Sequence, residues 1–141
     1  MATVELLISP LPAHVRTARL VAAAVARRAG VDEAVLDEVR LAVGEACSRA
    51  VGLHRGSGLG TPVRIALTDE EKLFSIEVAD DAPRTTSVDA VSGLSPAVLD
   101  AAETEEDQMG LAVISGLVDD LEVSAGSEGG LIRMTWPTAR A

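Results

Sequence analysis

The sequence predicts an α+β fold, a two-layer sandwich in which helices pack on one face of a mostly antiparallel mixed sheet. Two long stretches near the amino terminus repeat apolar residues at steps of three and four, which is typical of helices with one buried face. Two pairs of short segments alternate apolar and polar residues on either side of a turn, which is typical of hairpins. Hairpin strands pair antiparallel. In folds that combine an antiparallel sheet with helices, the helices usually cover one face of the sheet, and we expect the same here.

The first strand is expected at residues 3–8, where a proline-rich turn ends it. Residues 14–29 then predict a helix that ends at Gly30, because glycine readily adopts the backbone conformation that follows a helix. A second helix is expected over residues 32–53, with Asp32 as its amino-terminal cap. The apolar stripe of the first helix consists of Val15, Ala18, Ala22, Val25 and Ala29.

Two hairpins complete the predicted sheet. Residues 62–68 and 73–79 alternate apolar and polar side chains around an acidic turn at residues 69–72. Residues 121–124 and 131–136 do the same around a glycine-rich turn. We therefore expect five strands in a single domain spanning residues 1–141.

The segment 84–108 is long, polar and interrupted by glycine and proline, and residues 110–118 after it predict a third helix. A loop of this length in a compact domain is usually a functional lid or disordered. We therefore expect a lid-like loop, with a short helix at residues 95–102 inside it. Two interpretations stay open: a loop without a role of its own, and a segment that becomes ordered when a partner binds.

Composition and charge exclude several classes of function. The net charge of −10 argues against nonspecific binding to nucleic acid or to an anionic membrane. No apolar run reaches the roughly 18 residues of a membrane span. The single cysteine, Cys47, excludes an intrachain disulfide and fits a reducing cytoplasm. His14 and His54 lie far apart without a companion cysteine, so no zinc site is expected.

Residues 41–51 are the most informative stretch, because Glu45 is followed four residues later by Arg49 on one predicted helix. Together with the element order over residues 5–136, this stretch resembles the anti-sigma-factor serine kinases of the GHKL family (Bergerat ATP fold). In that family the glutamate orients or deprotonates a hydroxyl or a water, and an asparagine at the second position holds Mg²⁺. The resemblance implies that Glu45 is the catalytic position. Arg49 replaces the asparagine, and a guanidinium has no lone pair for a metal.

Two further motifs carry the resemblance. Asp80 matches the family carboxylate that accepts a hydrogen bond from the adenine amino group. Ala82 and Arg84 stand where the family has two glycines that let the backbone approach the nucleotide. At the start of the third helix Gly110 matches a family glycine, whereas Gln108 replaces the other one. The resemblance thus implies a nucleotide site at positions 45, 49, 80, 82, 84 and 110, several of which are altered.

The first predicted helix carries a third kind of signal. The resemblance places Arg19 where a family arginine contacts both the sigma factor and its anti-anti-sigma competitor, and Arg16 lies one turn before it. An arginine cluster on an acidic protein suits a partner that carries carboxylates. The alternative is an ordinary solvated helix face.

The sequence therefore predicts a regulatory binding protein that resembles an anti-sigma factor and has lost productive Mg·ATP binding, with no cofactor and no metal. Its expected partners are a sigma factor, a STAS-type anti-anti-sigma protein, or both, and the resemblance implies a homodimer. One alternative is an active serine/threonine kinase with Glu45 as base and Asp80 on the adenine. Another is a nucleotide sensor without turnover. For Glu45 itself, the alternative to chemistry is a helix-surface pair with Arg49.

Overall fold

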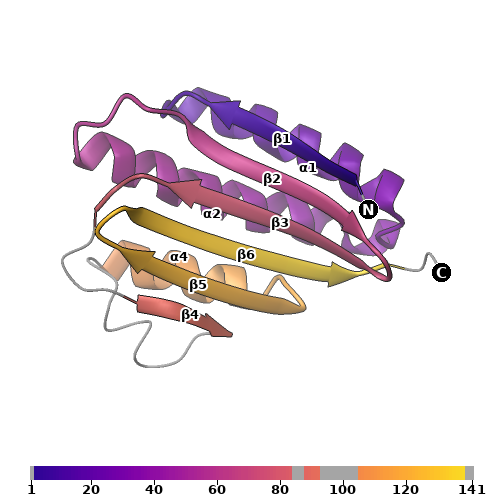
Figure 1. Cartoon of the computed structure of the whole chain (residues 1–141). Coiled ribbons are helices and arrows are strands. Elements are labelled where there is room, and N and C mark those ends of the chain that lie inside the picture. Colours follow the sequence, from indigo (N-terminus) through magenta and orange to yellow (C-terminus); the bar gives the residue numbers. More distant parts are fainter. Residues whose placement is uncertain (1, 84–87, 93–104, 139–141) are drawn as a thin grey trace.

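The computed structural model describes residues 2–83, 88–92 and 105–138 of the chain. The elements follow the predicted order, with one short strand added before the third long helix (Figure 1). Two one-turn 3₁₀ helices precede the first two long helices, η1 at Pro12–His14 and η2 at Glu33–Val35. The strands and long helices are β1 (Ala2–Ile8), α1 (Val15–Ala29), α2 (Leu36–Gly56), β2 (Val63–Glu70), β3 (Leu73–Asp80), β4 (Val88–Ser92), α4 (Glu105–Ser115), β5 (Asp120–Gly126) and β6 (Gly129–Pro137).

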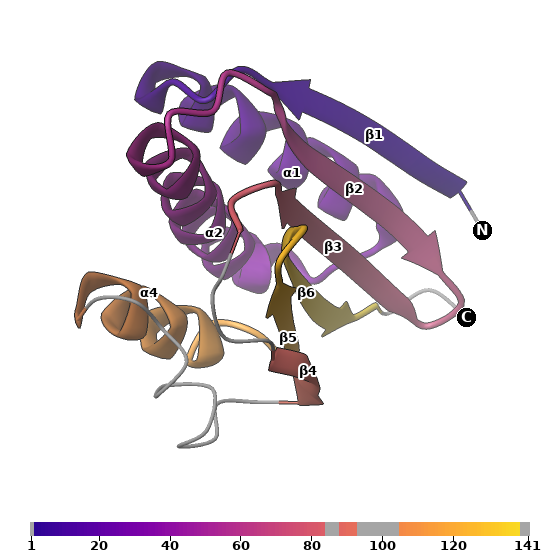
Figure 2. The same cartoon turned by 60° about the vertical axis from the view of Figure 1, so that its left-hand side comes forward.

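Six strands form one sheet in the order β1-β2-β3-β6-β5-β4, and each neighbouring pair is antiparallel. The helices α1, α2 and α4 lie on one face of this sheet, and no described helix covers the other face (Figures 1 and 2). The predicted two-layer α+β fold is confirmed. All described strands pair antiparallel, so the mixed sheet that was predicted is not observed.

The core lies between the helices and the inward face of β2, β3 and β6. Phe74 and Trp136 face each other across β3 and β6, with ring centroids 6.3 Å apart, and the Trp136 indole N–H donates to the Leu117 carbonyl at 3.0 Å. Elsewhere the core consists of aliphatic side chains. The buried residues of α1 are small, which lets α1 and α2 pack closely; they include Ala18, Ala22, Ala23, Ala26 and Ala29.

The ends of the first two helices follow the predicted signals. Gly30 ends α1 with a φ of 98°, a left-handed conformation that glycine adopts without steric cost. The Asp32 carboxylate accepts a hydrogen bond from the Ala34 amide at 3.0 Å and so caps η2, which leads directly into α2. α2 continues to Gly56, three residues beyond the predicted end.

The segment predicted as a lid-like loop is partly regular structure. Strand β4 pairs with β5 at the sheet edge, and α4 begins at Glu105 instead of Gly110. The β4 pairing shifts register between Val88 and Val91, and such an irregularity breaks the alternation by which strands are predicted. The acidic residues before Gly110 suggested a loop, yet acidic side chains suit the first turn of a helix. Residues 84–87 and 93–104, including Arg84 and the short helix predicted at 95–102, lie outside the described residues.

The sequence predicts no segment that is long and apolar enough to span a membrane. Among the helices that the structure describes, none is long and apolar enough to cross a membrane. The longest of them, α2, has an apolar face against the sheet and an exposed polar face.

Candidate functional site

A cleft of about 700 Å³ lies where the start of α1, the middle of α2 and the end of α4 meet. Its polar lining includes two of the predicted partner-binding residues and the predicted catalytic glutamate. Its apolar lining comes from all three helices. The residues used below are Arg16, Arg19, Leu41, Gly44, Glu45, Ser48, Val113 and Leu117.

The charged groups of this cleft are exposed and have no partner within the described structure. Arg16, Arg19 and Glu45 make no hydrogen bond or ion pair with any residue that the structure describes. Beside them, Leu41 and Val113 are 55% and 43% exposed and give the cleft an apolar wall. The cleft thus offers two cations, one carboxylate and an apolar wall to an incoming group.

At two glycines of this cleft, a side chain from a neighbouring helix lies against the helix backbone. A Cβ atom added to Gly44 on α2 would lie 2.8 Å from Cδ of Arg19, so the Arg19 side chain lies across the α2 backbone. A Cβ atom added to Gly110 on α4 would lie 3.4 Å from a carboxylate oxygen of Glu45. The structure therefore brings the two motif positions Glu45 and Gly110 close together.

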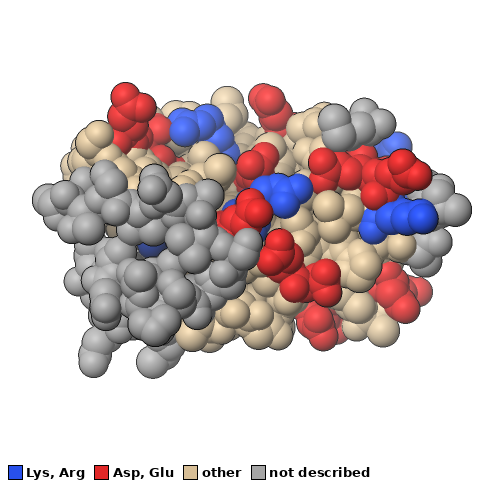
Figure 3. All heavy atoms as spheres, turned by 60° about the horizontal axis from the view of Figure 1, so that its bottom comes forward, with Lys and Arg blue, Asp and Glu red and all other residues tan. Residues whose placement is uncertain are grey.

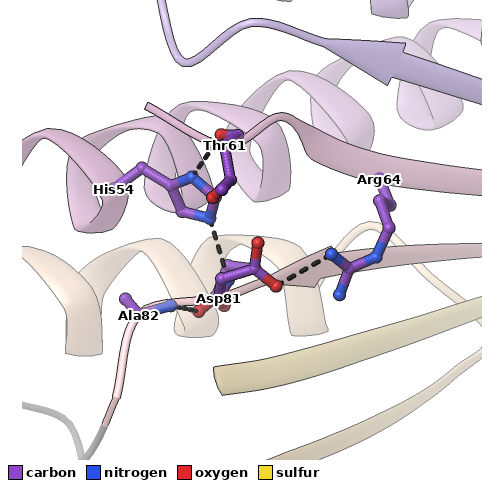
Figure 4. A network of polar contacts seen from close by, with 6 residues as sticks. His54, Thr61, Arg64, Asp81 and Ala82 are labelled. Atoms are coloured by element: carbon purple, nitrogen blue, oxygen red, sulfur yellow. Dashed lines mark hydrogen bonds and ion pairs between the residues drawn. The ribbon is translucent and has the colours of Figure 1, made fainter. Parts of the chain in front are cut away.

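A second polar cluster lies at the end of β3, beside the carboxyl end of α2 (Figure 4). His54 on α2 is fully buried; its Nδ1 lies 2.9 Å from the Thr61 carbonyl oxygen, and its Nε2 accepts from the Asp81 amide at 2.8 Å. Because Nε2 accepts, the proton of the neutral ring is assigned to Nδ1, which donates to Thr61. His54 thereby ties the turn after β3 to the loop after α2.

The carboxylates of this cluster are both engaged. The Arg64 guanidinium lies 2.8 Å from the Asp81 carboxylate, and hydrogen bonds from Arg64, then from the Thr61 side chain, lower the pKa of Asp81 below its usual value. The Asp80 carboxylate accepts from the Ala82 amide at 3.0 Å. Asp80 is 4% exposed and Ala82 is 1% exposed, so both residues of the predicted adenine position are buried.

The predicted site residues therefore fall into two groups. Arg16, Arg19 and Glu45 share the cleft, and Gly110 lies next to Glu45. Asp80 and Ala82 lie in the turn after β3 and do not line the cleft, while Arg49 is half-buried one turn beyond Glu45 on α2. Arg84 lies outside the described residues.

The third predicted helix is α4, which begins at Glu105 and not at Gly110. The phosphate-binding prediction assumed that Gly110 opens this helix. Unpaired amide groups belong to the first four residues of a helix, and in α4 these are residues 105–108. Gly110 lies in the second turn, so its amide is not at the helix end where a phosphate would be received. The described residues also contain no group of three or more His, Cys, Asp or Glu side chains arranged to hold a metal ion.

Sequence reasoning missed three residues of this region: His54, Asp81 and Gly129. His54 was weighed only as a zinc ligand. Gly129 belongs to a predicted glycine-rich turn, but its contact with Asp80 depends on the pairing of β3 with β6. No local pattern could have revealed these contacts, because the partners are far apart in the sequence.

Comparison with known proteins places this geometry in a family. Residues 8–136 match the family model described as the histidine kinase-like ATPase domain. Among solved structures, the chain is similar to the RsbU and RsbW domains of Rv1364c from Mycobacterium tuberculosis, with 17% sequence identity and a TM-score of 0.68. That alignment covers 99% of this chain and 34% of the other, so this chain spans about a third of that structure's length. No curated protein matches the chain.

Proposed function

The chain belongs to the histidine kinase-like ATPase domain family, and from this premise we propose that it is an anti-sigma regulatory factor-like binding protein. It binds a sigma factor, a STAS-type anti-anti-sigma protein, or both, through the cleft between α1, α2 and α4. The fold shared with a structure that contains an RsbW domain supports this class of partner. The homodimer implied by the family resemblance remains part of the proposal.

The observation that carries the proposal is the pair of guanidinium groups in the cleft, on Arg16 and Arg19, without an ion pair to any described residue. Some other arginines contact acidic residues: Arg133 pairs with Glu70 at 3.2 Å, and Arg64 pairs with Asp81. On the described part of the face seen in Figure 3, acidic side chains are common and basic ones lie among them. On a chain with a net charge of −10, two guanidiniums without an ion pair in the described part of the chain, beside an apolar wall, suit a partner segment that carries carboxylates and an apolar side chain.

Loss of productive Mg·ATP binding is the second part of the proposal. Arg49 stands at the metal-binding position and offers no lone pair. Gly110 lies inside α4 instead of at its amino terminus, where unpaired amide groups would receive phosphates. These residues do not fit a magnesium-bound triphosphate, so no catalytic step is assigned to them.

One observation favours the kinase alternative. Glu45 is exposed in the same cleft as Arg16 and Arg19, so a hydroxyl on a partner held by the arginines would come close to a potential general base. Phosphate transfer to a STAS partner that disappears in Glu45→Gln would establish this alternative.

The experiment that tests the proposal is a binding panel. Sigma factors and STAS-domain proteins from the source genome would be titrated into the purified chain by calorimetry, without nucleotide and then with ATP and Mg²⁺. We expect one of them to bind without nucleotide, and Arg19→Ala to weaken that binding. Arg28→Ala is the matched control, because Arg28 is exposed on the same helix and does not line the cleft. Equal effects of the two substitutions, or binding that requires nucleotide, would contradict the proposal.

A further inference from the structure

The Arg19 side chain of α1 lies against the backbone of α2 at Gly44. A Cβ atom on Gly44 would meet Cδ of Arg19 at 2.8 Å, Cγ at 3.4 Å and Nε at 3.8 Å. These are successive atoms of one side chain, so the Arg19 stem runs along the space that a side chain at position 44 would occupy. Its guanidinium then lies in the cleft that Glu45 and Ser48 also line.

The other glycine in the body of α2 has no such neighbour. A Cβ atom on Gly52 would meet nothing within 4 Å, and Gly52 is exposed. Glycine is among the poorest helix formers, so each of these glycines weakens α2. At Gly44 the absence of a side chain leaves room for Arg19, whereas at Gly52 no neighbouring group uses the space.

The atoms near Gly44 also show how a substitution would be accommodated. All three belong to a side chain with several rotatable bonds, and none belongs to the α1 backbone. A methyl group at position 44 would therefore displace Arg19 without separating the two helices. The fold would persist while the guanidinium lost its place.

We propose that Gly44 is a positioning residue, which holds the Arg19 stem against α2 and so presets the guanidinium in the cleft before any partner arrives. A long side chain that is already ordered loses less conformational entropy on binding, so preorganisation raises affinity. The proposal rests on the proposed function only for the identity of what Arg19 binds. The position of Arg19 itself is tested without a partner.

The first measurement is ¹⁵N relaxation at the arginine Nε positions of the free protein. In the wild type, the order parameter of Arg19 Nε should exceed that of Arg28, which lies on the same helix outside the cleft. In Gly44→Ala it should fall to the Arg28 value, below about 0.6, which is the range of flexible groups. Gly52→Ala is the matched control and should leave it unchanged. An Arg19 as mobile as Arg28 in the wild type, or unaffected by Gly44→Ala, overturns the proposal.

The second measurement is a thermal unfolding cycle. In an Arg19→Ala background the methyl group of Gly44→Ala meets none of the displaced atoms, so only its better helix propensity remains and Tm should rise. In the wild-type background the rise should be smaller, because Arg19 must move. A Tm that falls in both backgrounds would mean that position 44 contacts the α1 backbone, and would overturn the proposal. Neither measurement uses a partner, so failure of the binding panel and failure of this proposal are distinguishable.

Discussion

The buried imidazole of His54 accepts a hydrogen bond at Nε2 from the backbone N–H of Asp81, at 2.8 Å across 27 residues of sequence. Through this bond the carboxyl end of α2 holds the turn that follows β3. The same turn carries Asp80, whose carboxylate accepts from the Ala82 amide. One side chain of α2 therefore fixes the backbone at the position where the family resemblance implied adenine binding.

Removing this imidazole should leave two backbone groups without partners. His54→Leu would remove the partner of the Asp81 N–H and of the Thr61 carbonyl at a part-buried site, where a lost hydrogen bond costs about 0.5–1.5 kcal/mol. We expect the free energy of unfolding in urea to fall by about 1–3 kcal/mol for the two bonds together. His14→Leu is the control, because His14 is only half-buried. Similar losses for the two variants would show that the His54 hydrogen bonds contribute little.

Gly129 should tolerate no side chain. Its φ is 126°, and a Cβ atom there would lie 2.0 Å from the Asp80 carbonyl oxygen, a backbone atom that cannot turn aside. Gly129→Ala combines backbone strain with this overlap, so we expect a loss of at least about 2 kcal/mol of unfolding free energy. Gly60→Ala is the control, since a Cβ at Gly60 meets nothing within 4 Å. Retention of wild-type stability in Gly129→Ala would mean that the β5–β6 turn can move away from Asp80.

The Asp81–Arg64 pair should make stability depend on pH at the acidic end. Because the pKa of Asp81 is lowered in the folded state, the pair stabilises the fold above the usual Asp value of 3.8, and this contribution disappears as pH falls through the lowered pKa. The side chains are 50% and 29% exposed, so the contribution at pH 7 should be under about 1 kcal/mol. Arg64→Gln should lose that amount at pH 7 and nothing in strong acid. Unfolding curves at both pH values check this; a difference that persists in acid would assign the effect to packing of the Arg64 stem.

Restoring the family asparagine should not restore nucleotide binding. Arg49→Asn supplies a metal ligand, but Ala82 stays buried in the turn and Gly110 stays inside α4. We therefore expect calorimetry with millimolar ATP and Mg²⁺ to show no binding for the wild type or for this variant. Micromolar binding by the wild type would bring the kinase and sensor alternatives forward. Binding by the variant alone would show that Arg49 is the one residue that blocks the site.

The parts of the fold that sequence predicted are those with local signals. The extents of α1 and α2 follow from their apolar stripes, with Gly30 and Asp32 marking where one ends and the next begins. Strand β4 was missed because its register shift removes the alternation, and the start of α4 was missed because its acidic first turn suggested a loop. Local sequence patterns predict helices and regular strands. They do not predict an edge strand that forms only through pairing with its neighbour.

For the candidate site, the sequence singled out positions whose roles stay predictions. The family resemblance singled out Glu45 and Gly110, and the structure brings them together. It also singled out Arg19, but the position of that side chain depends on the crossing of α1 and α2 at Gly44. Such contacts follow from tertiary packing, so neither spacing nor composition reveals them.

Binding measurements should show that Arg19 and Gly44 act as one unit. Arg19→Ala removes an arginine at the centre of the proposed interface and should weaken partner binding by more than about 1 kcal/mol. Gly44→Ala should weaken it by less, because a displaced guanidinium can still reach the partner at an entropic cost. If Gly44 acts through Arg19, the double variant should bind no more weakly than Arg19→Ala alone, which gives a coupling energy equal to the whole Gly44→Ala effect. Calorimetry with the partner found in the panel measures all four affinities. Additive losses would mean that the methyl group at position 44 obstructs the partner directly, since removing Arg19 would then leave its effect intact.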